Sequence, residues 1–163
     1  MSTVTECAYE RTVRVESPVD DLYEEIDSVH RLARFIPQLA SDVEGTSDTT
    51  GDCRGVLAIG PLSYEVDGQL LVEPVSPMHN LEVALRAPAL RLELDGVLAL
   101  SPGANNETTL HYSATLRSTH PVLRRMPKAL SGVLEEHVDT TTDLIAVRGR
   151  QYTQARRALT EPD

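Results

Sequence analysis

Large aromatic side chains are scarce in this 163-residue chain, which has no tryptophan, one phenylalanine and five tyrosines. Aromatic rings contribute most to the filling of a protein core, so leucine and valine must do most of the packing here. Such an interior leaves room for a cavity, although a close-packed interior is the ordinary state of any fold.

Long hydrophobic runs are also absent. No stretch approaches the ~20 apolar residues that a membrane-spanning helix needs, and the first residues lack the basic start and apolar block of a secretory signal. We therefore expect a cytoplasmic protein with no integral membrane segment. The composition, 40% hydrophobic and 25% charged, is typical of a folded chain. Cys7 and Cys53 form no CxxC motif and are expected to be free thiols.

Lysine is almost missing from the sequence. Lys128 is the single lysine among 15 basic residues, against 25 acidic ones, and the net charge is −10. Such a surface repels phosphate backbones and anionic lipids, which argues against nucleic acid as a partner and against electrostatic membrane docking. Two explanations remain open, namely adaptation of a halophilic acidic protein to high salt and a GC-rich genome that favours Arg, Ala, Gly and Asp codons.

Familiar catalytic and metal-binding motifs are missing too. The five histidines show no HxH, HExxH or Cys/His spacing, so we expect no metal. The sequence has no Gly-x-Ser-x-Gly, no phosphate-binding loop and no dinucleotide fingerprint, which argues against the corresponding hydrolase, nucleoside triphosphatase and Rossmann classes. No cofactor is therefore expected.

Alternation of apolar and polar residues predicts a sheet, whose first strand covers residues 7–15. Two short helices follow, one capped at Ser17-Pro18 and ending near Asp27, the other through residues 30–34 and stopped by Pro37. The later strands are expected at residues 39–46 (weak), 53–59, 63–73, 80–86, 90–100 and 107–117. Because short connections join them, these six strands must be antiparallel neighbours, with one face covered and the other wet.

The element that covers the sheet comes last. After Pro121 a helical pattern runs to about Tyr152, and Pro127 either starts its main part or kinks it. One stripe at helical spacing, which we expect to face the sheet, contains Leu130, Leu134, His137, Thr141 and Leu144.

The predicted fold is therefore α+β. A curved antiparallel sheet of about seven strands wraps on a long C-terminal helix, and two short helices follow the first strand. We expect one domain over residues 1–152 and a polar C-terminal tail over residues 153–163.

Four local strings stand out along this order of elements. They are residues 15–23 (VESPVDDLY), 32–37 (LARFIP), 60–64 (GPLSY) with Gly68 beyond, and 106–112 (NETTLHY). With the element order, they resemble the START-like helix-grip (SRPBCC) superfamily, which includes polyketide cyclases/dehydratases and lipid-transfer domains. The nearer resemblance is to its branch of proteins related to the G-type component of carbon monoxide dehydrogenase. The resemblance implies the helix-grip fold and leaves the activity open, because that superfamily contains enzymes, carriers and binding modules.

A polar pair and a set of apolar residues form the candidate ligand site. A buried imidazole needs a partner, so His137, with Thr141 one turn away, either orients a polar group of a ligand or is a core histidine satisfied by Tyr64, Tyr112 or a carbonyl. Arg11 either neutralises an acidic ligand head or extends to solvent at the sheet edge. The candidate ligand-binding residues are Arg11, Tyr64, Leu81, Val83, Leu92, Leu94, Tyr112, Leu134, His137 and Thr141.

Three functions are compatible with these features. The first is the binding or carrying of a small hydrophobic molecule (lipid, quinone or polyketide-like) between the sheet and the last helix, without catalysis. The second is a polyketide cyclase/dehydratase-like enzyme in which His137 is the general acid or base. The third, implied by the resemblance alone, is an accessory protein of a molybdenum-type dehydrogenase, with a protein partner that the sequence does not identify.

Overall fold

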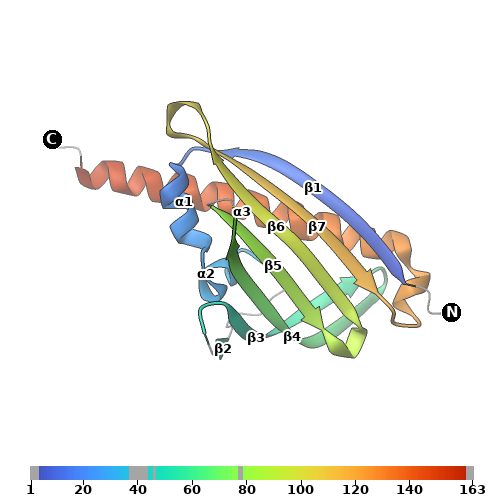
Figure 1. The fold of residues 1–163 in the computed structure, drawn as a ribbon. Helices are drawn as coiled ribbons and strands as arrows, with labels where there is room; N and C mark the ends of the chain where they lie inside the picture. The colour runs from blue at the N-terminus through green and yellow to red at the C-terminus, as the bar shows by residue number, and fades with distance from the viewer. Residues whose placement is uncertain (1–3, 37–43, 46, 77–78, 161–163) are drawn as a thin grey trace.

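The computed structural model describes residues 4–36, 44–45, 47–76 and 79–160, and Figure 1 shows one curved sheet with a long helix along it. The fold is α+β, as the sequence predicts. In chain order the strands and α-helices are β1 (Thr5–Val15), α1 (Val19–Ile26), α2 (Val29–Ala33), β2 (Glu44–Gly45), β3 (Thr50–Ile59), β4 (Leu62–Val75), β5 (Asn80–Ala87), β6 (Leu92–Pro102), β7 (Thr108–Ser118) and α3 (Pro127–Thr160).

All strand pairs are antiparallel, in the order β1-β7-β6-β5-β4-β3-β2. From β2 onward, each strand pairs with the next one in the chain, as short connections require. β1 instead pairs with β7, with Thr5 opposite Ser118 and Val15 opposite Thr108. In the described part of the chain, six strands are full-length and β2 has only two residues. The expected count of about seven is therefore six plus this short bridge; most of the weak strand expected at 39–46 lies outside the described residues.

The concave face of the sheet holds the core. In β7, Leu110, Tyr112, Ala114 and Leu116 are buried, whereas the residues between them are exposed or half-buried. Successive side chains of a strand point to opposite faces, so the period-two pattern of the sequence places one apolar row of each strand under α3.

Helix α1 begins one residue later than the capping pattern predicts. Pro18 is its N-cap residue, and the Ser17 hydroxyl, expected to cap the helix, is buried without a hydrogen-bond partner. The Ser17 carbonyl instead accepts a hydrogen bond from Thr108 Oγ1 at 2.6 Å. In α2, Ser28 does act as a cap, because its Oγ accepts from the Arg31 N–H at 3.2 Å.

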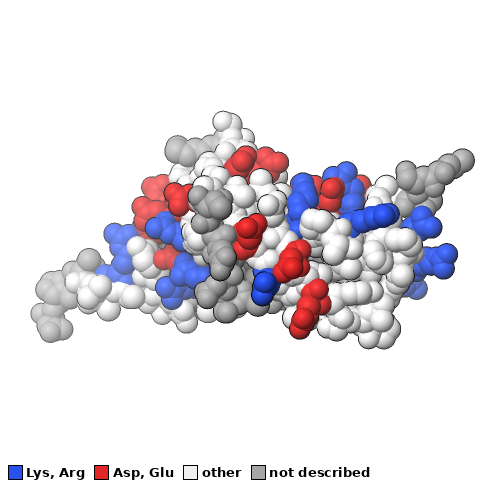
Figure 2. Space-filling view, turned by 90° about the horizontal axis from the view of Figure 1, so that it is seen from below, with Lys and Arg blue, Asp and Glu red and all other residues white. Residues whose placement is uncertain are grey.

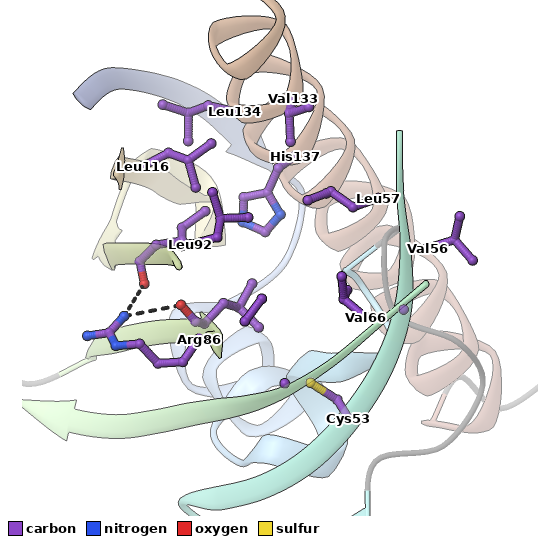
Figure 3. A pocket seen from close by; sticks show the side chains of 15 residues that line it. Cys53, Val56, Leu57, Val66, Arg86, Leu92, Leu116, Val133, Leu134 and His137 are labelled. Carbon is purple, nitrogen blue, oxygen red and sulfur yellow. Dashed lines mark hydrogen bonds between the residues drawn. The ribbon is translucent and has the colours of Figure 1, made fainter. Parts of the chain in front are cut away.

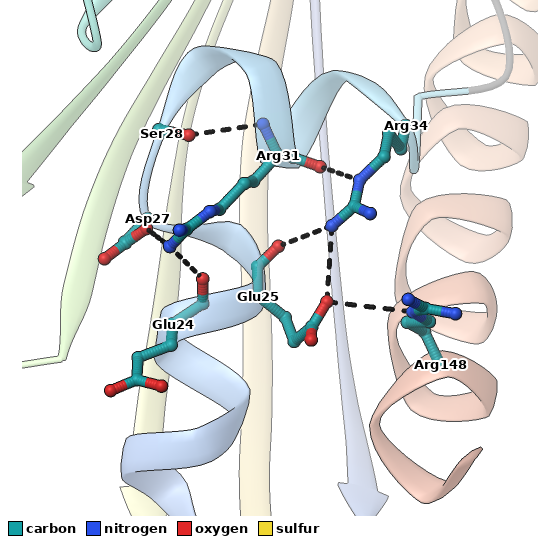
Figure 4. Close-up of polar contacts among 7 residues, drawn as sticks. All are labelled: Glu24, Glu25, Asp27, Ser28, Arg31, Arg34 and Arg148. Atoms are coloured by element: carbon teal, nitrogen blue, oxygen red, sulfur yellow. Dashed lines mark hydrogen bonds and ion pairs between the residues drawn. The ribbon is translucent and has the colours of Figure 1, made fainter. Parts of the chain in front are cut away.

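Ion pairs connect α1 and α2 with α3 (Figure 4). The Glu25 carboxylate lies 3.2 Å from Arg34 Nη2 and 3.7 Å from Arg148 Nε. Arg31 donates to the Glu24 carbonyl at 2.6 Å and to the Asp27 carboxylate at 2.9 Å. Because these arginines are about half exposed, the pairs fix the orientation of the short helices more than they stabilise the fold.

Helix α3 is longer than predicted, since it continues to Thr160 instead of ending near Tyr152. Residues 153–160 are mostly Gln, Ala, Arg and Leu, all good helix formers, and contain neither glycine nor proline. The segment expected as a polar tail is thus largely helical and exposed. Within the described residues, no helix combines the length and the apolar character that a bilayer span requires.

The sheet-facing stripe of α3 differs from the expected one near its middle. Leu130, Leu134, His137 and Thr141 are buried as predicted, but Leu144 is 41% exposed. The buried stripe passes instead through Val138, Thr142, Ile145 and Gly149. The prediction was therefore wrong at Leu144. The predicted positions repeat every 3.5 residues on average, whereas the helix has 3.6 residues per turn, so the buried face moves to later residues over many turns.

Most contacts of α3 are with β1 and β7, and fewer are with β3. The helix therefore lies along one side of the concave face and does not fill the space above the middle strands. Figure 1 shows the same arrangement, with β1 and β7 beside the helix and the other strands bending away from it.

Two glycines on α3 allow this packing to be tested. A Cβ at Gly149 would lie 2.8 Å from Val15 Cγ1 and 2.9 Å from Leu22 Cδ1, whereas a Cβ at Gly132 would meet nothing within 4 Å. We expect Gly132→Ala to stabilise the protein by up to about 1 kcal/mol, through helix propensity. The free energy of unfolding of Gly149→Ala should be about 1–3 kcal/mol lower than that of Gly132→Ala, because the core around Gly149 must shift to admit the methyl group. Chemical denaturation of both variants measures the difference, and equal stabilities would contradict the close packing of α3 on β1 and α1.

Candidate functional site

A cavity lies between α3 and the strands that bend away from it (Figure 3). Its lining is almost entirely apolar. The principal lining side chains are Cys53, Leu57 and Val66 of β3 and β4, Leu92, Leu94 and Leu116 of β6 and β7, and Val133, Leu134 and His137 of α3.

The enclosed part of the cavity is small. The open space between its atoms is about 620 Å³, including solvent at its mouth, and about 80 Å³ of it can hold the centre of a water-sized molecule. A small organic molecule fits such a space, whereas a long lipid chain would require the walls to move.

His137 is the polar ring that faces this cavity. It projects from α3 between the apolar side chains, as Figure 3 shows, and is 2% exposed. Its Nε2 lies 2.7 Å from the hydroxyl of Tyr112, which is itself 1% exposed. The two rings meet edge to face, with centroids 5.5 Å apart. His137 is thus a buried histidine with a protein partner, one of the two alternatives that the sequence left open.

Burial keeps both rings of this pair uncharged. Desolvation lowers the pKa of His137 to about 4 and raises the pKa of Tyr112 above its ordinary value. At neutral pH, the pair is a hydrogen bond between two neutral groups. It can orient a ligand, but His137 is a weak base at that pH.

A glycine on the neighbouring strand makes room for Tyr112. A Cβ at Gly96 of β6 would lie 2.7 Å from Tyr112 Cε1, so a larger residue there would displace the ring from His137. Gly68 of β4 similarly allows close approach, because a Cβ would lie 2.5 Å from the Arg86 carbonyl oxygen. Neither glycine was predicted to support the site, although glycine inside a strand often marks a close backbone approach.

The structure brings together part of the predicted site. Leu92, Leu94, Leu134 and His137 line the cavity, and Tyr112 joins them through its hydrogen bond. The remaining lining residues were not predicted from the sequence, among them Cys53, Val66, Leu116 and Val133.

Four other uncharged residues of the predicted site lie outside the cavity lining. Leu81 and Val83 are fully buried in the core and Tyr64 is half-buried, and none of them lines the cavity. Thr141 lies one turn beyond His137, is 1% exposed, and also falls outside the lining. Its hydroxyl has no hydrogen-bond partner in the described structure.

Arg11 lies between β1 and α3 and outside the cavity lining. Its Nη1 is 2.9 Å from the Asp139 carbonyl, 3.0 Å from Thr142 Oγ1 and 2.8 Å from the Asp143 carboxylate. The guanidinium is one third exposed and connects the edge strand to the helix. This position corresponds to the sheet-edge alternative for Arg11 and not to a ligand-facing one.

Arg86 is the cationic residue nearest to the cavity, but its charge points away from it. In Figure 3 the guanidinium extends outward. It donates to the carbonyls of Leu85 and Leu94 at 3.1 and 3.0 Å and to the Asp95 carboxylate at 2.8 Å. Among the residues that the structure describes, the lining therefore presents no unpaired charge to the interior.

The solved structures to which this chain is similar share its architecture. A conserved protein from Geobacillus kaustophilus superimposes with a TM-score of 0.72 at 16% identity, covering 89% of this chain and 96% of that one. The Zhui aromatase/cyclase from Streptomyces sp. R1128 gives 0.68 at 13% identity, with 94% and 96% covered. A START superfamily protein from Mycobacterium smegmatis gives 0.62 at 13% identity, with 86% and 97% covered.

This chain has the START-like helix-grip fold. No family model and no curated protein matches it. At these identities the likeness establishes the fold alone. The helix-grip fold predicted from the four sequence strings is confirmed, and the resemblance to the branch related to carbon monoxide dehydrogenase stays a prediction.

The buried imidazole predicts a pH dependence of stability. The unfolded chain takes up a proton at His137 near pH 6.5, and the folded chain does so only near pH 4. Stability should therefore fall as the pH drops from 6.5 towards 4, by up to about 3 kcal/mol from this group. Urea denaturation between pH 7 and 4.5 should show a shallower loss for His137→Gln than for wild type. His30→Gln, at an exposed position of α2, is the matched control variant. If stability fell with pH as steeply in His137→Gln as in wild type, the assignment to His137 would be contradicted.

Adjacent threonines on α3 give a second test. Thr141 has a buried hydroxyl without a partner, whereas Thr142 Oγ1 donates to the Val138 carbonyl at 2.9 Å and accepts from Arg11. Valine has the same shape and the same branching as threonine. We expect Thr141→Val to raise the free energy of unfolding by about 1 kcal/mol and Thr142→Val to lower it by a similar amount or more. Thermal denaturation measures both, and the reverse order would refute the assignment.

Proposed function

We propose that this chain binds a small, mainly apolar molecule in the cavity between α3 and the sheet. One observation supports the proposal above others: a partly open space in the interior of the fold is lined mainly by apolar side chains, with the hydrogen-bonded His137–Tyr112 pair at its wall. Apolar concave sites with a few placed polar groups are the usual form of small-molecule sites.

Burial of apolar ligand surface in this cavity provides enough free energy for specific binding of modest affinity. Burial of about 200 Å² of apolar ligand surface contributes roughly 5 kcal/mol, and the loss of ligand freedom reduces this. We therefore expect the best ligands to be compact and rigid, since they lose the least entropy on binding. A lipid, a quinone or a polyketide-like molecule would be bound through a compact part of its body.

A cyclase- or dehydratase-type enzyme is the second candidate. It is favoured by His137, a proton acceptor at the wall of the cavity with Tyr112 within hydrogen-bond distance. We place it second because the lowered pKa of His137 makes the imidazole a weak base at neutral pH. If wild type turned over a polyketide-like substrate and His137→Ala bound that substrate but no longer turned it over, the enzyme would become the first candidate. The accessory role beside a molybdenum-type dehydrogenase stays a prediction from sequence resemblance.

Filling the cavity should abolish binding. Val66 is half-buried in the lining, and Val97 of β6, 39% exposed on the outer face, is its matched control. We expect wild type and Val97→Phe to bind the neutral fluorophore N-phenyl-1-naphthylamine, with increased emission, and Val66→Phe to bind it at least about tenfold more weakly. Fluorescence titration measures the affinity, and circular dichroism confirms that each variant is folded. Equal affinity in Val66→Phe and Val97→Phe would show that the fluorophore binds elsewhere.

A further inference from the structure

The charge of the ligand is the property that the cavity wall restricts most strongly. We infer that the cavity takes electrically neutral ligands and rejects the carboxylate or ammonium form of a molecule of the same shape. This inference rests on the proposed function, and it adds a substrate class to it.

The polar pair offers no charge to a ligand. His137 Nε2 is 2.7 Å from the Tyr112 hydroxyl, and both rings are almost fully buried. An anionic ligand would need a cation or several aligned donors at this wall. The imidazole is neutral above about pH 4, because burial lowers its pKa.

The other ionisable groups of the lining are neutral or engaged. Cys53 is 7% exposed, and its pKa is raised by burial first and then by Asp52 and Asp67. Its thiol is therefore uncharged at neutral pH. The Arg86 guanidinium is bound to two carbonyls and to Asp95 on the outer side of the sheet. The lining, as far as the structure describes it, contains no aspartate or glutamate that could pair with a bound ammonium.

Charged side chains are instead found on the outside of the molecule. Figure 2 shows acidic and basic residues on one face, side by side in several places, with uncharged surface between these groups. The −10 net charge adds a long-range repulsion for anions approaching the mouth. A ligand ion would thus lose its hydration on entry and gain no counter-charge, whereas its neutral isostere would lose little.

Isosteric pairs of two-ring ligands test this directly. The first pair is 2-acetylnaphthalene and 2-naphthoate, in which a methyl group replaces the carboxylate oxygen. The second is 2-ethylnaphthalene and 2-naphthylmethylammonium. Competition against N-phenyl-1-naphthylamine at pH 7.5 gives all four affinities. We expect each neutral member to bind at least about a hundredfold more tightly than its charged partner.

The controls separate this inference from the proposed function. Val66→Phe should weaken binding of 2-acetylnaphthalene and Val97→Phe should not, which locates the ligand in the cavity. Binding of 2-naphthoate or of the ammonium within tenfold of its neutral partner overturns the inference and leaves the proposed function standing. Failure of wild type to bind either the fluorophore or the neutral naphthalenes overturns both.

Discussion

The packing of α3 against β1 and β7 determines the rest of this structure. These two strands contact the helix closely, and Gly149 allows Val15 of β1 and Leu22 of α1 to approach the helix backbone. The middle strands follow the curvature of a twisted sheet away from the helix. Few aromatic side chains are available to fill the space that results. The cavity is therefore a consequence of one helix that covers only part of a curved sheet, together with side chains too small to close the remainder.

The Tyr112–His137 hydrogen bond decides what kind of cavity this is. A histidine at such a buried position would destabilise the fold without a partner. Tyr112 supplies that partner from β7, and Gly96 on the adjacent strand gives the tyrosine ring its room. The contact makes the imidazole tolerable in the core, and burial there lowers the pKa of His137 to about 4. Burial thus keeps the imidazole neutral and limits both its value as a base and its attraction for ions.

The alternating pattern of the strands predicted the fold well, because side-chain direction in a strand is a local property with a period of two residues. The failures occurred where local signals compete with packing. Ser17 has the sequence of a helix cap, but its hydroxyl is buried beside α3 instead. Leu144 continues an apolar spacing from Leu130, yet the seam has moved to Ile145 by that point of the helix. Ser17 depends on packing between segments far apart in the chain, and at Leu144 the predicted spacing had drifted away from the 3.6-residue period of the helix.

The sequence by itself determined the order of elements, the antiparallel sheet, the final helix, and the burial of His137 on that helix. These follow from periodicity, turn residues and short connections, all of which act over a few residues. Only the tertiary structure decided that Tyr112 is the partner of His137, that Arg11 contacts α3, and that Cys53, Val66 and Val133 share one cavity. Such contacts join residues far apart in the chain, and they depend on the curvature of the sheet and the placement of the helix above it.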